Sequence, residues 1–147
     1  QINRNPLEVL PSMIQFAEVL HGLFANLHER DQVAVRQARI LAASIDRLIQ
    51  FRDVHPEFGG QFLDVHYNDL MADPMAVIHH IYAHFRLPWT QTTAWRMREF
   101  ILRNDRDTSR KRSRKLTDAR LDIPVEATRF DNYCRRFGVL YERARGH

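Results

Sequence analysis

The sequence has little cysteine, few turn-forming residues and no long apolar run. Cys134 is its single cysteine, which excludes an internal disulfide framework and a cysteine-based zinc cluster and fits a reducing compartment. Only 5 glycines and 6 prolines occur in 147 residues, below the average usage of about 12%, and this favours long helices over an all-β fold. No apolar run approaches the roughly 18 residues of a membrane span, and no basic-then-apolar leader is visible. We therefore expect a helix-rich cytoplasmic protein that does not span a membrane.

Positive charge is concentrated in one segment. Lys and Arg together number 22 and Asp and Glu 18, a formal net charge of +4. Residues 103–115 alone sum to +5, so the rest of the chain is close to neutral. A neutral chain with one basic segment indicates a local anion site, and the serines within the segment favour a loop.

Apolar periodicity predicts five helices, over residues 6–29, 31–51, 74–85, 91–102 and 125–137. Asn5 and Asp73 each precede a proline, which is tolerated at the first helical position, so both are predicted N-caps. Glu8 stands where a capping box puts its carboxylate, and Asp31 is the predicted cap of the second helix. Gly138 is expected to end the last helix.

Several single residues carry structural expectations. Pro11 lies inside the first helix and is expected to kink it or to delay its regular start. Trp89, Trp95 and Phe100 are expected in the core, and Cys134 is expected to be a small buried residue.

Residues 62–67 alternate between apolar and polar side chains after a turn, which predicts a strand. A lone strand cannot form a sheet. Either it pairs with strands outside this chain, the strand prediction fails, or a second strand ends near Asn3. Because the chain opens at Gln1 rather than at a methionine, we expect a piece of a longer protein.

Four segments in order resemble the C-terminal half of the sulfotransferase family, especially its bacterial branch. Arg4-Asn5-Pro6 is followed by Ser12, eight residues after the arginine. Tyr67-Asn68-Asp69-Leu70 leads to Asp73-Pro74, where the family reads close to Tyr-Glu-Asp-Leu…Asp-Pro. Leu87-Pro88-Trp89 is similar to the family's Gly-Leu-Pro-Trp, and residues 129–138 are similar to the way those chains end.

The resemblance implies a P-loop NTPase-like α/β fold. Residues 1–147 would be one partial, mostly helical sulfotransferase domain with one or two strands. The implied activity moves a sulfuryl group from 3′-phosphoadenosine 5′-phosphosulfate (PAPS) to a hydroxyl or amine of a small-molecule or glycan acceptor, without a metal. The family positions that match Arg4 and Ser12 hold the 3′-phosphate, and the one that matches Tyr67 lies near the adenine. A late basic segment also reaches that phosphate, and its candidates here are Arg110, Lys111, Arg112 and Arg114.

The chemistry of these residue types agrees with the resemblance. An arginine fork matches two phosphate oxygens, and a serine hydroxyl at the start of a helix adds a donor beside unpaired backbone N–H groups. A tyrosine at a strand end offers a flat face to a purine. Any nucleotide phosphate would be served by such a set.

The chain also departs from the family pattern. The Gly-rich 5′-phosphosulfate loop and the catalytic His or Glu usually precede the Arg-x-Pro segment, and neither occurs here. We therefore expect the catalytic residue upstream of Gln1 and an inactive isolated chain. Residues 112–115 replace the His-x-Tyr-Ser that the family normally shows in this region.

Alternative interpretations stay open at this point. The chain could be a non-enzymatic helical module whose residues 103–115 meet nucleic acid or an acidic partner, although the segment lacks the interleaved aromatic residues of single-strand binders. His80 and His84 have a metal-compatible spacing, but no acidic residue completes the turn, so a polar helix face is expected. Asp69 and Asp73 could form an acid–base pair, although Asp73 is better explained as an N-cap. The sequence specifies neither the acceptor nor the oligomeric state.

Overall fold

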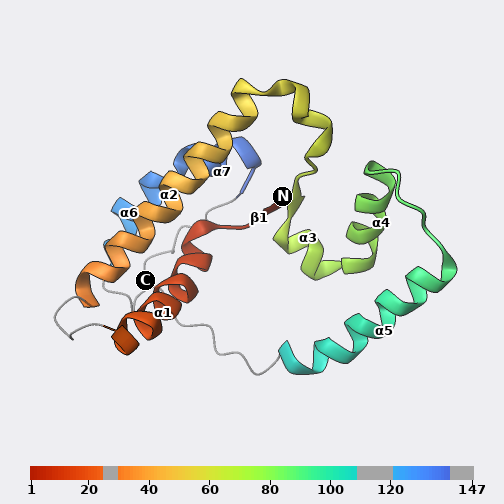
Figure 1. The fold of residues 1–147 in the computed structure, drawn as a ribbon, viewed down its shortest axis with the longest axis horizontal. Helices are drawn as coiled ribbons and strands as arrows, with labels where there is room; N and C mark the ends of the chain where they lie inside the picture. The colour runs from red at the N-terminus through yellow and green to blue at the C-terminus, as the bar shows by residue number, and fades with distance from the viewer. Residues whose placement is uncertain (25–29, 109–120, 140–147) are drawn as a thin grey trace, which may run out of the picture. The chain divides into compact units, whose positions relative to one another are not determined.

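The computed structural model describes residues 1–24, 30–108 and 121–139, which form two compact units (Figure 1). We call Gln1–Asn3 with the described part of Glu57–Arg112 the strand unit, and Arg4–Pro56 with the described part of Ser113–His147 the helix unit. The elements in chain order are β1 (Ile2–Asn3), α1 (Pro6–Phe24), α2 (Arg30–Val54), the 3-10 helix η2 (Pro56–Gln61), β2 (Val65–His66), α3 (Tyr67–Ala72), α4 (Pro74–His84), α5 (Gln91–Thr108), α6 (Ile123–Arg129) and α7 (Asp131–Phe137). Among these described helices, none has both the length and the apolar content needed to cross a membrane.

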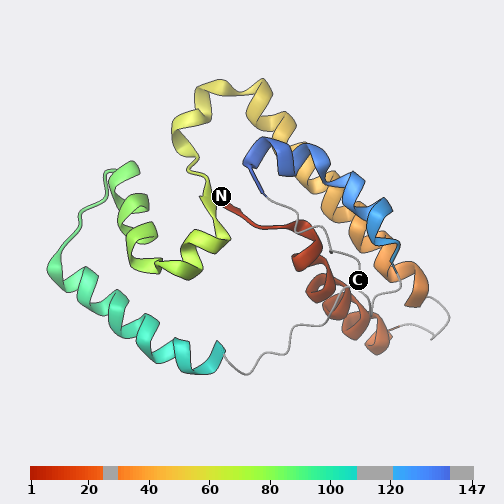
Figure 2. The ribbon, with the colours of Figure 1, turned by 180° about the vertical axis from the view of Figure 1, so that it is seen from behind.

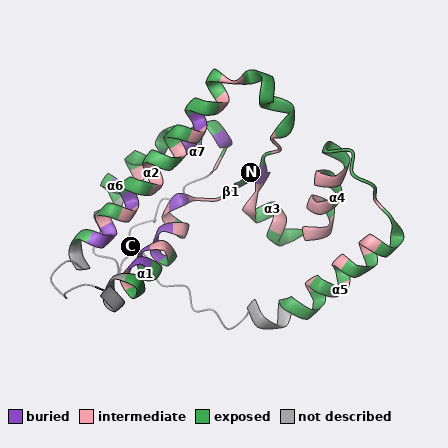
Figure 3. Ribbon diagram, in the orientation of Figure 1, coloured by how far each residue is buried: buried purple, intermediate pink, exposed green. Residues whose placement is uncertain are grey.

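The helix unit is built on the pairing of α1 with α2, with α6 and α7 running along α2 (Figures 1 and 2). Its buried residues gather on the facing sides of these helices (Figure 3). One cluster joins α1 to α2 through side chains spaced four residues apart on each helix, which places them on one helical face. Its buried members are Leu10, Ile14, Ala34 and Ala38.

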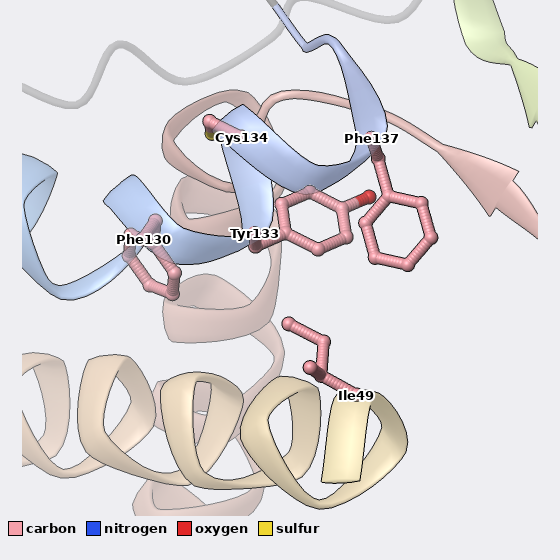
Figure 4. Packing of buried hydrophobic residues seen from close by; sticks show 5 residues of the cluster. All are labelled: Ile49, Phe130, Tyr133, Cys134 and Phe137. Atoms are coloured by element: carbon pink, nitrogen blue, oxygen red, sulfur yellow. The ribbon is translucent and has the colours of Figure 1, made fainter. Parts of the chain in front are cut away.

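A second cluster packs the C-terminal helices against α2. In Figure 4 Ile49 points from α2 toward the side chains of α7, and the rings of Tyr133 and Phe137 lie beside each other with centroids 5.0 Å apart. Phe130 is fully buried, and Cys134 is buried as predicted. Residues 130–137 are therefore part of the core of the helix unit.

Three predictions for the first two helices can be compared with the structure. Asn5 caps α1 as predicted, because its side-chain oxygen accepts the Leu7 N–H at 3.0 Å. The helix begins at Pro6, so Pro11 does not delay its start. The prediction for Asp31 is wrong, because α2 already begins at Arg30.

The single helix predicted over residues 125–137 is two helices. They meet at Phe130, whose backbone leaves helical geometry (φ −103°, ψ 3°) while its ring fills the core. Asp122 caps α6 by accepting the Val125 N–H at 3.3 Å. Gly138 ends α7 in the left-handed conformation (φ 62°), as predicted.

The strand unit contains the only two strands of the described residues. β1 and β2 are parallel, with Ile2 opposite Val65 and Asn3 opposite His66. The predicted strand over residues 62–67 is thus shorter, because its partner is two residues long and the chain then turns into α1. Tyr67 is the first residue of α3, a helix that the sequence did not predict.

Helix α5 differs most from expectation. It begins at Gln91 as predicted but continues through Thr108, so residues 103–108 are helical rather than a loop. An ion pair four residues apart, from Arg103 Nη2 to Glu99 Oε2 at 3.2 Å, supports this extension. Trp95 and Phe100 are not in the core: they are 61% and 69% exposed, because α5 turns its other face inward. Trp89 is half-buried, with edge contacts to His79 and Tyr82.

Candidate functional site

Arg4 follows β1 directly and precedes the cap of α1. Its backbone N–H donates to the Tyr133 hydroxyl at 3.3 Å, and its Nε donates to Glu8 Oε2 at 3.0 Å. The Arg4 side chain is 36% exposed, so the guanidinium is accessible from solvent while the backbone is tied to α7. A cation is therefore held near the N-terminal end of α1, where the helix dipole also favours anions.

Ser12 lies on α1 but not at the helix start. It is the seventh residue of α1, it is exposed, and its hydroxyl donates to the Val9 carbonyl at 2.7 Å. The expectation of a serine beside unpaired N–H groups is wrong, because the helix already begins at Pro6. Ser12 shares a face of α1 with Glu8, four residues earlier, and Arg4, which precedes the helix, pairs with Glu8.

Glu8, on the same face of α1, makes a different contact from the one that the sequence predicted. It was expected to complete a capping box, but its carboxylate pairs with Arg4. Its position four residues from both Arg4 and Ser12 places it between them, with a rise of about 6 Å to Ser12. The spacing of four residues between opposite charges was the signal that could have identified the pair.

Tyr67 belongs to the strand unit. It comes directly after the paired residue His66, and its side chain is half-buried at the first position of α3. Its role beside the adenine stays a prediction.

The remaining predicted phosphate ligands lie outside the described residues; they are Arg110, Lys111, Arg112 and Arg114. The described beginning of the basic segment belongs to α5.

The structure also bears on the Asp69–Asp73 and His80–His84 clusters. Asp73 caps α4, since its Oδ1 accepts the Ala76 N–H at 2.9 Å, as predicted. His80 and His84 are exposed, and His84 Nε2 lies 3.3 Å from the Gly60 carbonyl. Within the described ranges, no group of three or more His, Cys, Asp or Glu side chains is placed to hold a metal ion.

The C-terminal motif anchors α7 to α2. Arg136 Nη2 pairs with Asp53 Oδ1 at 2.5 Å, and the guanidiniums of Arg52 and Arg136 lie 5.3 and 5.9 Å from the centre of the Phe137 ring. These contacts hold α7 and, through the Tyr133 hydroxyl, fix the backbone at Arg4. Tyr133 is thus a second residue of the site that sequence reasoning did not single out.

Arg4 thus lies in the sequence between β1 and α1, with a partly exposed guanidinium. The family model described as "Sulfotransferase family" matches residues 1–91. Because this is more than half of the chain, the chain belongs to the sulfotransferase family.

One solved structure has the same fold. The chain is similar to the sulfotransferase STF9 from Mycobacterium avium, with a TM-score of 0.77 at 21% sequence identity. The match covers 96% of this chain and 36% of the mycobacterial chain, so the present chain spans about a third of that protein's length. The expected sulfotransferase fold, mostly helical here with two strands, is confirmed. No curated protein sequence matches the chain.

Proposed function

We propose that this chain forms the 3′-phosphate side of the donor site in a PAPS-dependent sulfotransferase. The observation that carries the proposal concerns Arg4: its backbone N–H donates to Tyr133, and its side chain pairs with Glu8, one helical turn before Ser12 on α1. A 3′-phosphate requires strong, directional donors, and an arginine beside a helix N-terminus supplies them.

The residue types at the proposed site suit PAPS as the sulfuryl donor. Arg4 would neutralise the 3′-phosphate, and Ser12 would donate one hydrogen bond after leaving the Val9 carbonyl. Tyr67, directly after β2, would face the adenine. The further candidate ligands of the phosphate are Arg110, Lys111, Arg112 and Arg114. These residues bind and orient the donor, and the chemical step itself falls to other groups.

PAPS supplies the activated sulfuryl group. The acceptor oxygen or nitrogen forms a bond to sulfur while the bond from sulfur to the 5′-phosphate oxygen breaks, and the acceptor proton passes to a general base distinct from these binding residues. 3′-Phosphoadenosine 5′-phosphate (PAP) is the leaving product. Positioning and positive charge would supply most of the rate enhancement. A small molecule or a glycan is the expected acceptor, and a cytoplasmic location stays part of the proposal.

Calorimetry with PAP and adenosine 5′-monophosphate (AMP) tests the proposal on the 147-residue chain. PAP should bind more tightly, because AMP lacks the phosphate that Arg4 would hold. The variant Arg4→Ala should weaken PAP by about 1.5–3 kcal/mol, the usual value of a hydrogen bond to a charged group, and leave AMP unchanged. Arg103→Ala removes the same side chain from another exposed Arg–Glu pair and serves as the control. Equal affinities of the wild-type chain for PAP and AMP would exclude the proposed site.

A further inference from the structure

The Arg4–Glu8 ion pair places a carboxylate where a phosphate is expected to bind. Glu8 Oε2 accepts from Arg4 Nε at 3.0 Å, and the two side chains are 54% and 36% exposed. Glu8 also stands one helical turn before Ser12, on the same face of α1. A phosphate held by Arg4 and Ser12 would therefore lie close to a second negative charge.

The Arg4–Glu8 ion pair is expected to contribute little to stability. Exposed pairs of opposite charge four residues apart on a helix typically contribute a few tenths of a kcal/mol, because water screens them and both side chains lose freedom. A phosphate binds arginine more strongly than a carboxylate in that setting, since it brings more charge and more acceptor oxygens. Arg4 can thus exchange one anionic partner for the other at small cost.

We infer that Glu8 is the exchange partner of the donor's 3′-phosphate, and this inference rests on the proposed function. Glu8 holds Arg4 when no 3′-phosphate is present and releases it when the phosphate arrives. The carboxylate then stays nearby and repels the bound phosphate, which lowers the affinity for PAP and favours product release. A nucleotide without the 3′-phosphate leaves the pair intact, so its affinity does not depend on Glu8.

The size of the effect follows from Coulomb's law. A carboxylate roughly 5 Å from a phosphate, at the dielectric constant of water and with partial screening by salt, changes the dissociation constant by about three- to ten-fold. The variant Glu8→Gln keeps the size of the side chain and an oxygen acceptor for Arg4 Nε but removes the charge. Because Glu8 is exposed, this change should leave the fold intact, which thermal denaturation checks.

The experiment compares wild type, Glu8→Gln and Glu99→Gln by calorimetry with PAP and with AMP, at low and at high salt. Glu99→Gln is the matched control, because Glu99 forms the same type of exposed pair with Arg103 on α5. We expect Glu8→Gln to tighten PAP about three- to ten-fold at low salt, with a smaller gain at high salt and no change for AMP. Glu99→Gln should change neither affinity.

The outcomes separate this inference from the proposed function. If wild type prefers PAP over AMP but Glu8→Gln leaves PAP binding unchanged or weaker, the exchange role is wrong and the proposed function stands. If Glu8→Gln tightens AMP as much as PAP, Glu8 acts as a general surface charge and the inference is equally overturned. If wild type does not distinguish PAP from AMP, the proposed function fails and the exchange role fails with it.

Discussion

Arg86 occupies a backbone position that suits glycine, so glycine at this position should give a more stable protein than alanine does. Helix α4 ends with the Arg86 N–H donating to the Ala83 carbonyl at 3.2 Å and the Leu87 N–H donating to the Tyr82 carbonyl at 2.8 Å. This is the Schellman pattern, in which the residue after the C-cap is left-handed and is usually glycine. Arg86 indeed has φ 53°, and its side chain is exposed. The family motif Gly-Leu-Pro-Trp has glycine at this place.

The expected gain can be worked from these backbone angles. A residue with a Cβ loses roughly 1–2 kcal/mol of stability in a left-handed conformation, and glycine avoids this cost. Glycine also has more conformational freedom in the unfolded chain, which reduces its gain by about 0.5–1 kcal/mol. Compared with Arg86→Ala, which lacks the same charge, Arg86→Gly should therefore have a free energy of unfolding higher by about 0.5–1 kcal/mol. Gly138 offers the reverse experiment, since it has φ 62° and the Val139 N–H donates to the Cys134 carbonyl at 2.9 Å. Gly138→Ala should lower stability by a similar amount.

Thermal and urea denaturation measure both changes. For a chain of this size, about 1 kcal/mol corresponds to a shift of the midpoint by about 2–4 °C. Arg86→Ala is the control, because it keeps the Cβ strain and removes only the charge near the C-terminus of α4. That charge contributes about 0.3–1 kcal/mol, so Arg86→Ala should be neutral or destabilising. If Arg86→Gly is no more stable than Arg86→Ala, the argument from backbone strain is refuted.

Local signals in the sequence predicted the local features of the fold. Asn5, Asp73 and Gly138 each act through hydrogen bonds or backbone angles within a few residues, so their neighbours in the sequence suffice to identify them. Trp95 and Phe100 show the limit of such reasoning. Their burial depends on which face of α5 meets another element, and apolar residues occur on more than one face of that helix.

The sequence pointed to several residues of the candidate site but not to the contacts that these residues make. Arg4 and Ser12 were proposed from a motif that resembles the sulfotransferase family, and the expected position of Ser12 at a helix start was wrong. The hydrogen bond from the Arg4 N–H to Tyr133 joins residues 129 positions apart, and no pattern in the sequence specifies such a contact. The strand prediction for Tyr67 is wrong. Residues 62–67 alternate between apolar and polar side chains, but the pairing of β2 with β1 ends at His66, opposite the last residue of β1.

Two further substitutions test the cap of α4 and the hydrogen bond between Tyr133 and Arg4. Asp73→Ala removes the cap of α4 and should cost about 0.5–2 kcal/mol in urea denaturation, whereas Asp73→Asn should retain most of the stability; equal losses would contradict the capping role. Tyr133→Phe removes the hydroxyl that accepts from the Arg4 N–H but keeps the ring against Phe137. Since the backbone at Arg4 then loses a neutral hydrogen bond, the free energy of unfolding should fall by about 0.5–1.5 kcal/mol. PAP binding should weaken about two- to five-fold in calorimetry while AMP binding is unchanged, because only the 3′-phosphate depends on where Arg4 is held. A loss of stability with unaltered PAP affinity would show that Tyr133 supports the core of the helix unit without positioning Arg4.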